Sequence, residues 1–279
     1  LNNDIGLPLM LLRLRAAHRA AVIEVGMNHP GETAYLADIA RPTVALVNNA
    51  QREHQEFMKG VEEVAREHGA LFAALPAQGT AVINADDPYA AYWRTLVRPQ
   101  QVRDFGIEQT AAVSGRYALS DFGSDIALSA PEGSVRFRLQ VAGLHSVRNA
   151  VGAAAGATAA GASLAMVAKG LSGFSAVKGR LQIRRGRSGA VIIDDTYNAN
   201  PDSVRAAIEV LRGLPGRRIL VLGDMGEVGE RGDMFHREAG RCASEAGIDE
   251  LLAIGDLAAH AFAEFGSGGI WYAQIEGLL

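Results

Sequence analysis

The sequence predicts an α/β protein, with a central doubly wound sheet that carries a β-rich insertion and a smaller Rossmann-like domain behind it. Three observations predict this fold class. Short apolar runs alternate with segments of helical period, the stretch 102–139 alternates apolar and polar residues instead, and the α/β alternation restarts after residue 182. Strand–helix–strand alternation is typical of doubly wound sheets, and apolar–polar alternation is typical of antiparallel strands with one wet face.

The first part of the chain supplies the predicted parallel strands. Apolar runs at 20–26, 43–49 and 80–87 are short, and each ends in Gly, Asn or Asp. Segments of helical period at 31–40 and 59–75 separate them. Because both faces of a parallel sheet are covered, its strands are near-continuous apolar runs. We therefore expect three buried strands whose carboxyl ends carry polar groups.

The middle of the chain changes character twice. Residues 102–139 predict a β-rich insertion, and the Ala/Gly-rich segment 145–171 predicts tightly packed helices. The stretch 175–182 is interpreted as a linker, with the hinge of a domain closure at Lys178 and Gly179 because glycine tolerates changes in φ and ψ.

The last part of the chain repeats the alternation of strand and helix. Its predicted elements are a strand at 190–195, a helix at 201–211, a strand at 217–225, a helix at 234–246 and a strand at 250–256. This pattern favours a Rossmann-like domain. We expect an incomplete central domain over 1–178 and a C-terminal domain over 180–279.

The helix predicted at 201–211 follows a segment rich in polar side chains, DDTYNANPDS. Asn200 or Asp202 would cap this helix, and Pro201 would lie in its first turn. A solvated turn does not need so many polar side chains at the end of a strand, so the segment is also a candidate binding loop.

Composition excludes several classes of protein. The 279 residues carry a formal net charge of −4 without a Lys/Arg-rich run, which argues against nucleic-acid partners. The single cysteine, Cys242, excludes an intrachain disulfide framework and a Cys-rich zinc site. No apolar run approaches 18 residues, so we expect a cytoplasmic monomer that does not enter a membrane. The chain begins at Leu1, and we expect its natural N-terminus to lie upstream.

Three side chains near strand ends are candidates for metal binding or loop structure. Glu24 interrupts an apolar run and is either a Mg²⁺ ligand or a carboxylate bonded to backbone N–H groups. His54 follows a strand, but a lone histidine is a weak metal signal. His29 precedes a Pro-Gly turn, where hydrogen bonding within the loop is the favoured interpretation.

Other local patterns concern nucleotides. Asn84 and Asp87 in INADDP would bind a polar ligand edge or cap a helix. The stretch 223–230 is Gly-rich but does not fit GxGxxG, which argues against an oxidoreductase that binds a dinucleotide. No GxxxxGK[ST] occurs, so the chain contains no P-loop motif.

Taken in order, several stretches together resemble the Mur ligases, and the resemblance covers nearly the whole chain. The most distinguishing are DDTYNANPDS and the NHPGE turn. The full series is NNDIGLPLMLL, AVIEVGMNHPGE, VALVNN with a later EH, AVINADD, GLHSVRNAVGAAA, VKGRLQ, IIDDTYNANPDSV and LVLGDMGEVGE. The resemblance implies a central ATPase domain followed by a C-terminal domain. It also implies that the family's UDP-sugar domain and P-loop lie upstream of this chain.

The resemblance implies an ATP-dependent acid–D-amino-acid ligase that uses Mg²⁺ in peptidoglycan precursor synthesis, and hence in cell wall biogenesis, cell shape and cell division. It would join D-alanyl-D-alanine to UDP-N-acetylmuramoyl-tripeptide through an acyl phosphate. Two alternatives remain: another amino-acid ligase of the same family, or a nucleotide-binding module without chemistry of its own. Without a P-loop we expect the 279-residue chain alone to be inactive.

The resemblance also implies roles for particular residues. Glu24 and His54 match Mg²⁺-binding positions, and Arg180 matches an interdomain arginine that reaches the phosphates. Asn3, Asn28 and His29 would face the peptide acceptor. The positions that it implies for the nucleotide site are Asn84, Asp87, His145, Asn149, Asp195, Tyr197 and Asn198.

His68 departs from the family pattern. Many members carry at this position a lysine that CO₂ carbamylates to an anionic Mg²⁺ ligand, and an imidazole forms no such stable carbamate. Two interpretations are open. Either His68, or a water that it holds, takes over the region of the second metal, or His68 is a residue of the helix surface.

Overall fold

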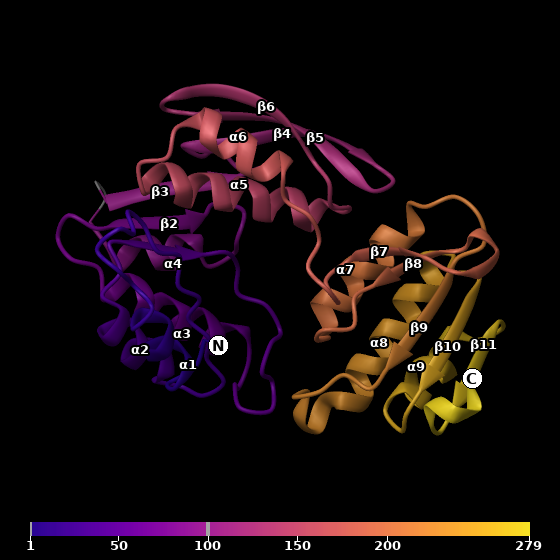
Figure 1. The fold of residues 1–279 in the computed structure, drawn as a ribbon. Helices are drawn as coiled ribbons and strands as arrows, with labels where there is room; N and C mark the ends of the chain where they lie inside the picture. Colours follow the sequence, from indigo (N-terminus) through magenta and orange to yellow (C-terminus); the bar gives the residue numbers. More distant parts are fainter. Residues whose placement is uncertain (1, 99–100) are drawn as a thin grey trace.

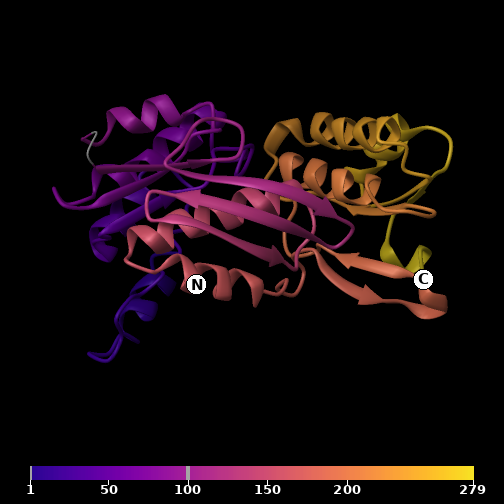
Figure 2. The same ribbon diagram turned by 90° about the horizontal axis from the view of Figure 1, so that it is seen from above.

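The structure, a computed structural model, describes residues 2–98 and 101–279. Leu1, the first residue of the predicted central domain, lies outside the described residues. The chain forms two parts that lie side by side (Figure 1), and the first part runs through helix α6. Figure 2 shows the second part beside the first, with a two-stranded hairpin that starts near their boundary and extends away from the first part.

The first part is built on one six-stranded sheet in the order β1-β2-β3-β4-β5-β6. Neighbouring strands from β1 to β4 are parallel, and β4, β5 and β6 are antiparallel. The strands are β1 (Val44–Val47), β2 (Thr80–Asn84), β3 (Val102–Gly106), β4 (Val113–Ser120), β5 (Gly123–Ala130) and β6 (Gly133–Leu139). The helices are α1 (Gly6–Leu11), α2 (Glu32–Ala40), α3 (Val61–Ala73), α4 (Ala90–Thr95), α5 (Leu144–Ala159) and α6 (Leu164–Ser172).

Two hydrophobic cores cover the two faces of this sheet. In β2, Val82 packs in the core that contains α5, whereas Ala81 and Ile83 pack in the core that contains α3 and α4. Successive side chains of a strand point to opposite faces, so one apolar run serves both cores. Small residues let α5 lie close to the sheet, because a Cβ added at Gly152 would lie 2.9 Å from the ring of Phe105.

The predicted α/β class is confirmed, and the β-rich stretch 102–139 continues the central sheet instead of forming a sheet of its own. β3 pairs in parallel with β2, and β4 then pairs in parallel with β3 at Phe105↔Val113. Only from β4 onward does the antiparallel pattern of the sequence correspond to antiparallel pairing.

The prediction of a strand at 20–26 is wrong, because this segment has no regular secondary structure. Among the described strands, β1 is the edge of the sheet and pairs with β2 alone, so the segment 20–26 does not join the ladder. Val22 is 99% exposed, and Gly26 donates its N–H to the carbonyl of Asn2. An apolar run becomes a strand only where a neighbour pairs with its backbone.

The second part contains a three-stranded parallel sheet in the order β11-β10-β9, with three helices packed in its core. Its elements are α7 (Pro201–Arg212), β9 (Ile219–Gly223), α8 (Gly232–Glu245), β10 (Glu250–Ile254), α9 (Ala258–Phe265) and β11 (Gly269–Tyr272). The sequence interpretation missed α9 and β11, and also α1 and α4 of the first part.

The strand expected at 190–195 exists but does not join the parallel sheet. It is β8 (Val191–Asp194), and it pairs antiparallel with β7 (Gln182–Arg185) as a separate hairpin. Ser188 and Gly189 adopt positive φ values of 58° and 83° in the connection. A Gly-Arg-Ser-Gly stretch directly before the apolar run 190–193 is a turn signal, and the sequence interpretation overlooked it.

Within residues 2–98 and 101–279, none of the helices has the length and apolar character needed to span a membrane.

Candidate functional site

The segment from Asp194 to Asp202 runs along the boundary between the two parts of the molecule. Asp195 accepts a hydrogen bond from the linker N–H of Leu181. Asn198 and Asn200 line a small cavity together with residues of the first part, and Asp202 bonds to Arg52 of the first part. The segment predicted as a candidate binding loop therefore lies where groups of both parts meet.

Four predicted site residues gather at the linker, and we call them the linker cluster: His145, Arg180, Asp195 and Tyr197. The guanidinium carbon of Arg180 lies 4.2 Å from the ring centroid of Tyr197, at cation–π distance. The N–H of Tyr197 donates to the carbonyl of Gly179 at 3.0 Å. Gly179 has a φ of +72°, and a Cβ there would lie 3.1 Å from the nitrogen of Tyr197, so this close approach requires glycine.

Burial and charge set the protonation of the linker cluster. Burial raises the pKa of Asp195, while the N–H of Leu181 and the charges of His145 and Arg180 oppose that rise. Burial lowers the pKa of His145, which Asp195 partly opposes. The imidazole is therefore neutral at pH 7, and its ring nitrogens present one donor and one acceptor. The linker cluster contains a cation, a carboxylate and two rings. A nucleotide has phosphates, hydroxyl groups and a base that such groups can contact.

A cavity of about 50 Å³ lies between the two parts. Its lining residues come from the loop after β1, the loop before α7 and the loop after β9, and they are Arg52, Glu53, His54, Asn198, Ala199, Asn200, Gly226, Glu227 and Val228. Nδ1 of His54 lies 2.5 Å from Oε2 of Glu227, so a candidate residue of the first part contacts a carboxylate of the second. His54 has a φ of 50°, which is uncommon for a residue other than glycine and often marks a functional site.

The sequence interpretation missed Arg52 and Glu227, which make most of the polar contacts at this boundary. Arg52 bonds to the carboxylates of Asp202 and Glu238, and Glu227 bonds to His54. Glu227 lies in the Gly-rich stretch 223–230, which does not fit GxGxxG and is one of the stretches that resemble the Mur ligases. No periodicity or motif singles out Arg52, because its partners are 150 and 186 residues away in the sequence.

Carboxamides meet at the carboxyl ends of β1 and β2. Asn48 donates from Nδ2 to Oδ1 of Asn149 at 2.7 Å, and Asn84 donates from Nδ2 to the carbonyl of Asn48 at 2.8 Å. Asp87 accepts from the N–H groups of Ala50 and Tyr89. Asn84 and Asp87 are buried and bonded to the backbone of nearby loops. Helix α4 has no side-chain cap, so neither residue caps it, and their contact with a ligand edge stays a prediction.

His68 is not a residue of the open helix surface, because its side chain is 23% exposed and lies between two oxygens. Nδ1 lies 3.1 Å from the carbonyl of Asn49, and Nε2 lies 3.2 Å from Oε1 of Glu53. The contact with Glu53 lacks hydrogen-bond geometry, and Oε1 of Glu53 is buried without a hydrogen-bond partner. Both contacts are with protein oxygens, and the hypothesis that His68 takes over the region of the second metal stays a prediction.

The predicted metal residues do not assemble into a ligand set. The expectation that Glu24 is a buried carboxylate at a strand end is wrong, because Glu24 is exposed and accepts a hydrogen bond from Asn2 at 3.0 Å. Its strand does not form, so nothing buries the side chain. Across residues 2–98 and 101–279, no three His, Cys, Asp or Glu residues lie together as metal ligands. Glu24, His54 and His68 thus remain candidate metal ligands that lie apart from one another.

The predicted acceptor residues form local contacts in the first part. Asn3 accepts from the N–H of Gly6 at 2.8 Å at the start of α1. The backbone N–H groups of Asn28 and His29 donate to Oε2 of Glu32, and the His29 ring packs on Phe57 at 4.5 Å. These bonds support the loop interpretation of His29.

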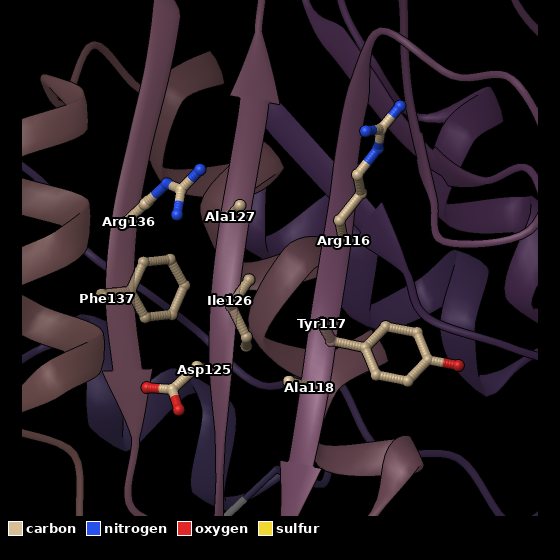
Figure 3. A pocket seen from close by; sticks show the side chains of 8 residues that line it. All are labelled: Arg116, Tyr117, Ala118, Asp125, Ile126, Ala127, Arg136 and Phe137. Carbon is tan, nitrogen blue, oxygen red and sulfur yellow. The ribbon is translucent and has the colours of Figure 1, made fainter.

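A larger concavity than the cavity between the two parts, about 590 Å³, lies elsewhere, on the strands β4, β5 and β6 (Figure 3). Arg116, Ala127 and Arg136 stand opposite one another on these strands by register. None of the predicted site residues lines this concavity, so the boundary between the two parts is the better candidate site.

Comparison with known families agrees with the sequence motifs. The Mur ligase middle domain matches residues 1–157, and the Mur ligase glutamate ligase domain matches residues 179–275. Among curated proteins, UDP-N-acetylmuramoyl-tripeptide–D-alanyl-D-alanine ligase of Escherichia coli is 39% identical over 259 residues, which cover 91% of this chain and 57% of that protein.

Similar solved structures also come from MurF ligases. A crystal structure of MurF from Acinetobacter baumannii has a TM-score of 0.93 and 36% identity, and the match covers 99% of this chain and 61% of that one. MurF ligase from Thermotoga maritima, solved in complex with ADP, has a TM-score of 0.85 over 97% of this chain and 62% of its own, and at 24% identity it shows the fold alone. The chain thus spans somewhat more than half the length of these relatives.

Proposed function

The chain belongs to the Mur ligase family, and from that premise we propose that it forms the middle and C-terminal domains of an ATP-dependent ligase. The ligase joins D-alanyl-D-alanine to UDP-N-acetylmuramoyl-tripeptide in cytoplasmic peptidoglycan precursor synthesis. We place the boundary between the two domains at the linker, near Lys178 to Arg180.

The observation that carries this proposal is the 39% identity to a ligase of this specificity over 91% of the chain, because it extends through both domains. The geometry adds support. The linker cluster brings Arg180, Asp195 and Tyr197 of the linker and C-terminal domain near His145 of the middle domain. A nucleotide bound there would contact both domains.

The proposed reaction has two steps. A carboxylate oxygen of the tripeptide attacks the γ-phosphorus of ATP, the bond to the bridging oxygen breaks, and ADP leaves with an acyl phosphate formed. The dipeptide amine then attacks the acyl carbon, the carbon–oxygen bond to phosphate breaks, and the amine proton is lost. Because a carboxylate is a poor electrophile, phosphorylation is what makes the second step possible.

The chain's own residues would bind and orient the nucleotide. The exposed guanidinium of Arg180 would stabilise phosphate charge, as positioned cations do in phosphoryl transfer. Asp195 and Tyr197 would contact the ribose, Asn198 would lie towards the phosphates, and the neutral ring of His145 would contact the base.

Mg²⁺ is part of the proposal as the family's metal, with Glu24 and His54 as its first candidate ligands. The two side chains do not belong to one ligand set in this structure, and each is bonded to a partner, Asn2 and Glu227 respectively.

Phosphate release tests the proposal. We expect the 279-residue chain alone to release no phosphate above background, since it contains no P-loop motif. A longer polypeptide that joins the same residues to a Mur-type N-terminal domain and P-loop should release phosphate when ATP, the UDP-tripeptide and D-alanyl-D-alanine are all present.

The matched control replaces D-alanyl-D-alanine by single amino acids. Preference of the longer polypeptide for a single amino acid would assign the chain to another ligase of the family. Ligation by the 279-residue chain alone would contradict the expected need for the P-loop.

A further inference from the structure

The most extensive ion-pair network of the described residues crosses the domain boundary through one side chain, Arg52. We propose that Arg52 is a positioning residue that fixes the C-terminal domain on the middle domain and thereby holds Glu227 against the His54 ring. This inference concerns the domain arrangement, and it does not depend on the ligation reaction.

The guanidinium of Arg52 forms a fork to two carboxylates at once. Nη2 donates to Oδ1 of Asp202 at 2.6 Å, and Nε lies 3.1 Å from both oxygens of that carboxylate. Nη1 and Nη2 donate to the two oxygens of Glu238 at 2.6 and 3.0 Å. The backbone N–H of Arg52 also donates to Asp202, at 2.9 Å. Such planar bidentate pairing fixes geometry as well as charge, which a lysine could not do.

The network is shielded from solvent, which strengthens it. The side chains of Arg52, Asp202 and Glu238 are 20%, 21% and 30% exposed. The guanidinium lies 5.5 Å from the ring centroid of Phe235, a buried residue of the C-terminal core. Removing the arginine would leave two partly buried carboxylates without their shared cation, which is strongly unfavourable.

The loop that carries Arg52 also carries His54, and the two domains touch closely there. Glu56 donates its N–H to the carbonyl of Glu227 at 3.1 Å. A Cβ at Gly229 would lie 3.1 Å from Cα of Glu56, and Gly229 has a φ of +59°. The loop after β9 thus lies directly on the loop after β1, and small displacements of either would separate His54 from Glu227.

Anchoring Arg52 therefore determines which partner the His54 ring has. Arg52 precedes His54 by two residues and is fixed at both its backbone and its side chain. With the loop held in this way, the carboxylate of Glu227 bonds to Nδ1 of His54. Nε2, the other ring nitrogen, takes no part in this bond. A carboxylate on one nitrogen fixes the orientation and tautomer of a histidine. The C-terminal domain would supply this orientation to a residue of the middle domain.

Interdomain distances test the proposal in the 279-residue chain. Spin labels at Ala34→Cys in α2 and Ser244→Cys in α8, in a Cys242→Ser background, place one exposed label on each domain. Double electron–electron resonance should give one narrow distance distribution for this parent. Because domains without a strong interface move relative to each other, Arg52→Ala should widen the distribution about twofold or more.

Arg205→Ala is the matched control. Arg205 also pairs with Glu238, but it lies in the C-terminal domain itself and is 55% exposed, so the parent distribution should persist. Equal broadening in both variants, or none in Arg52→Ala, would overturn the proposal. If circular dichroism shows that Arg52→Ala does not fold, the distance distribution is measured in the double variant Asp202→Asn, Glu238→Gln. This variant removes the same ion pairs and keeps Arg52, so its distribution should also broaden.

A second readout follows the His54 ring itself. The ¹⁵N resonance of Nδ1, assigned by its loss in His54→Gln, should shift in Arg52→Ala as the bond to Glu227 is lost and should stay in place in Arg205→Ala. An unshifted resonance in the presence of broadened distances would refute the link between Arg52 and His54.

Discussion

Arg180 lies in an environment that differs from that of an ordinary surface cation. Its guanidinium lies over the Tyr197 ring, and the backbone on either side of it adopts positive φ at Gly179 and Leu181. The ring and the fixed backbone restrict where the charge lies, while the side chain stays exposed to a ligand. A cation held in this way loses little conformational freedom when an anion binds.

Arg180→Ala should therefore weaken binding of a non-hydrolysable ATP analogue. A hydrogen bond to a charged group contributes roughly 1.5–3 kcal/mol, which corresponds to a loss of about tenfold or more in affinity. Isothermal titration calorimetry on the polypeptide that includes a P-loop measures the change. Arg116→Ala is the control, because Arg116 is exposed on β4 and points away from the other labelled side chains in Figure 3. Equal losses of affinity in the two variants would show that removing any positive charge weakens binding, and not the Arg180 contact in particular.

At the scale of elements, α7 connects the candidate site to the C-terminal core. Asn200 caps it by accepting from the N–H of Ser203 at 2.8 Å, and Ser203 returns a bond by accepting from the N–H of Asn200. Pro201 occupies the first turn, where its missing N–H is not needed. The predicted cap is confirmed at Asn200, whereas Asp202 bonds to Arg52 and serves the domain boundary instead.

Loss of this cap should be measurable in stability. Asn200→Ala is expected to lower the free energy of unfolding by ~1 kcal/mol, because the N–H of Ser203 loses its acceptor. Urea denaturation followed by circular dichroism measures the difference. Asn198→Ala is the control in the same loop, since Asn198 is exposed and its side chain accepts from the N–H of its neighbour Ala199 instead of capping the helix. A loss as large in Asn198→Ala would argue against capping as the cause.

The elements also reveal where sequence patterns were insufficient. Helices such as α3, α7 and α8 were predictable, because each carries its own apolar periodicity and its own start signals. The segment 20–26 and β8 have equally apolar sequences, yet one is irregular and the other pairs in a hairpin. A strand depends on a partner from elsewhere in the chain, so its local sequence does not determine which sheet it joins.

At the scale of the whole molecule, the domain arrangement depends on charged groups that respond to acid. Burial alone would raise the pKa of Asp202, but the hydrogen bonds from Arg52 outweigh it and the pKa is lowered. The hydrogen bonds from Arg52 likewise lower the pKa of Glu238. Arg205 adds its positive charge near both carboxylates. A lowered pKa in the folded state means that the folded chain binds fewer protons than the unfolded chain at acid pH.

The interdomain distance should accordingly depend on pH in one direction only. The contribution of the two carboxylates is complete above their unfolded pKa values, near 4, and is lost as the pH falls through the lowered values. We expect the spin-label distribution to stay constant from about pH 8 to about pH 5 and to broaden below about pH 4. The Asp202→Asn, Glu238→Gln variant should be broad throughout, and an acid response equal to that of the parent would contradict this assignment.

The sequence by itself determined the fold class, most helices, the family, and the segments that could carry a site. These depend on local periodicity, caps and contiguous motifs, which are readable in one stretch of chain. Only the tertiary structure decided which residues meet: that Arg52 joins Asp202 and Glu238, that Glu227 reaches His54, and that Glu24 is exposed. Such contacts join positions far apart in the chain, and nothing in the neighbouring sequence encodes a partner that only the packing of two domains brings into reach.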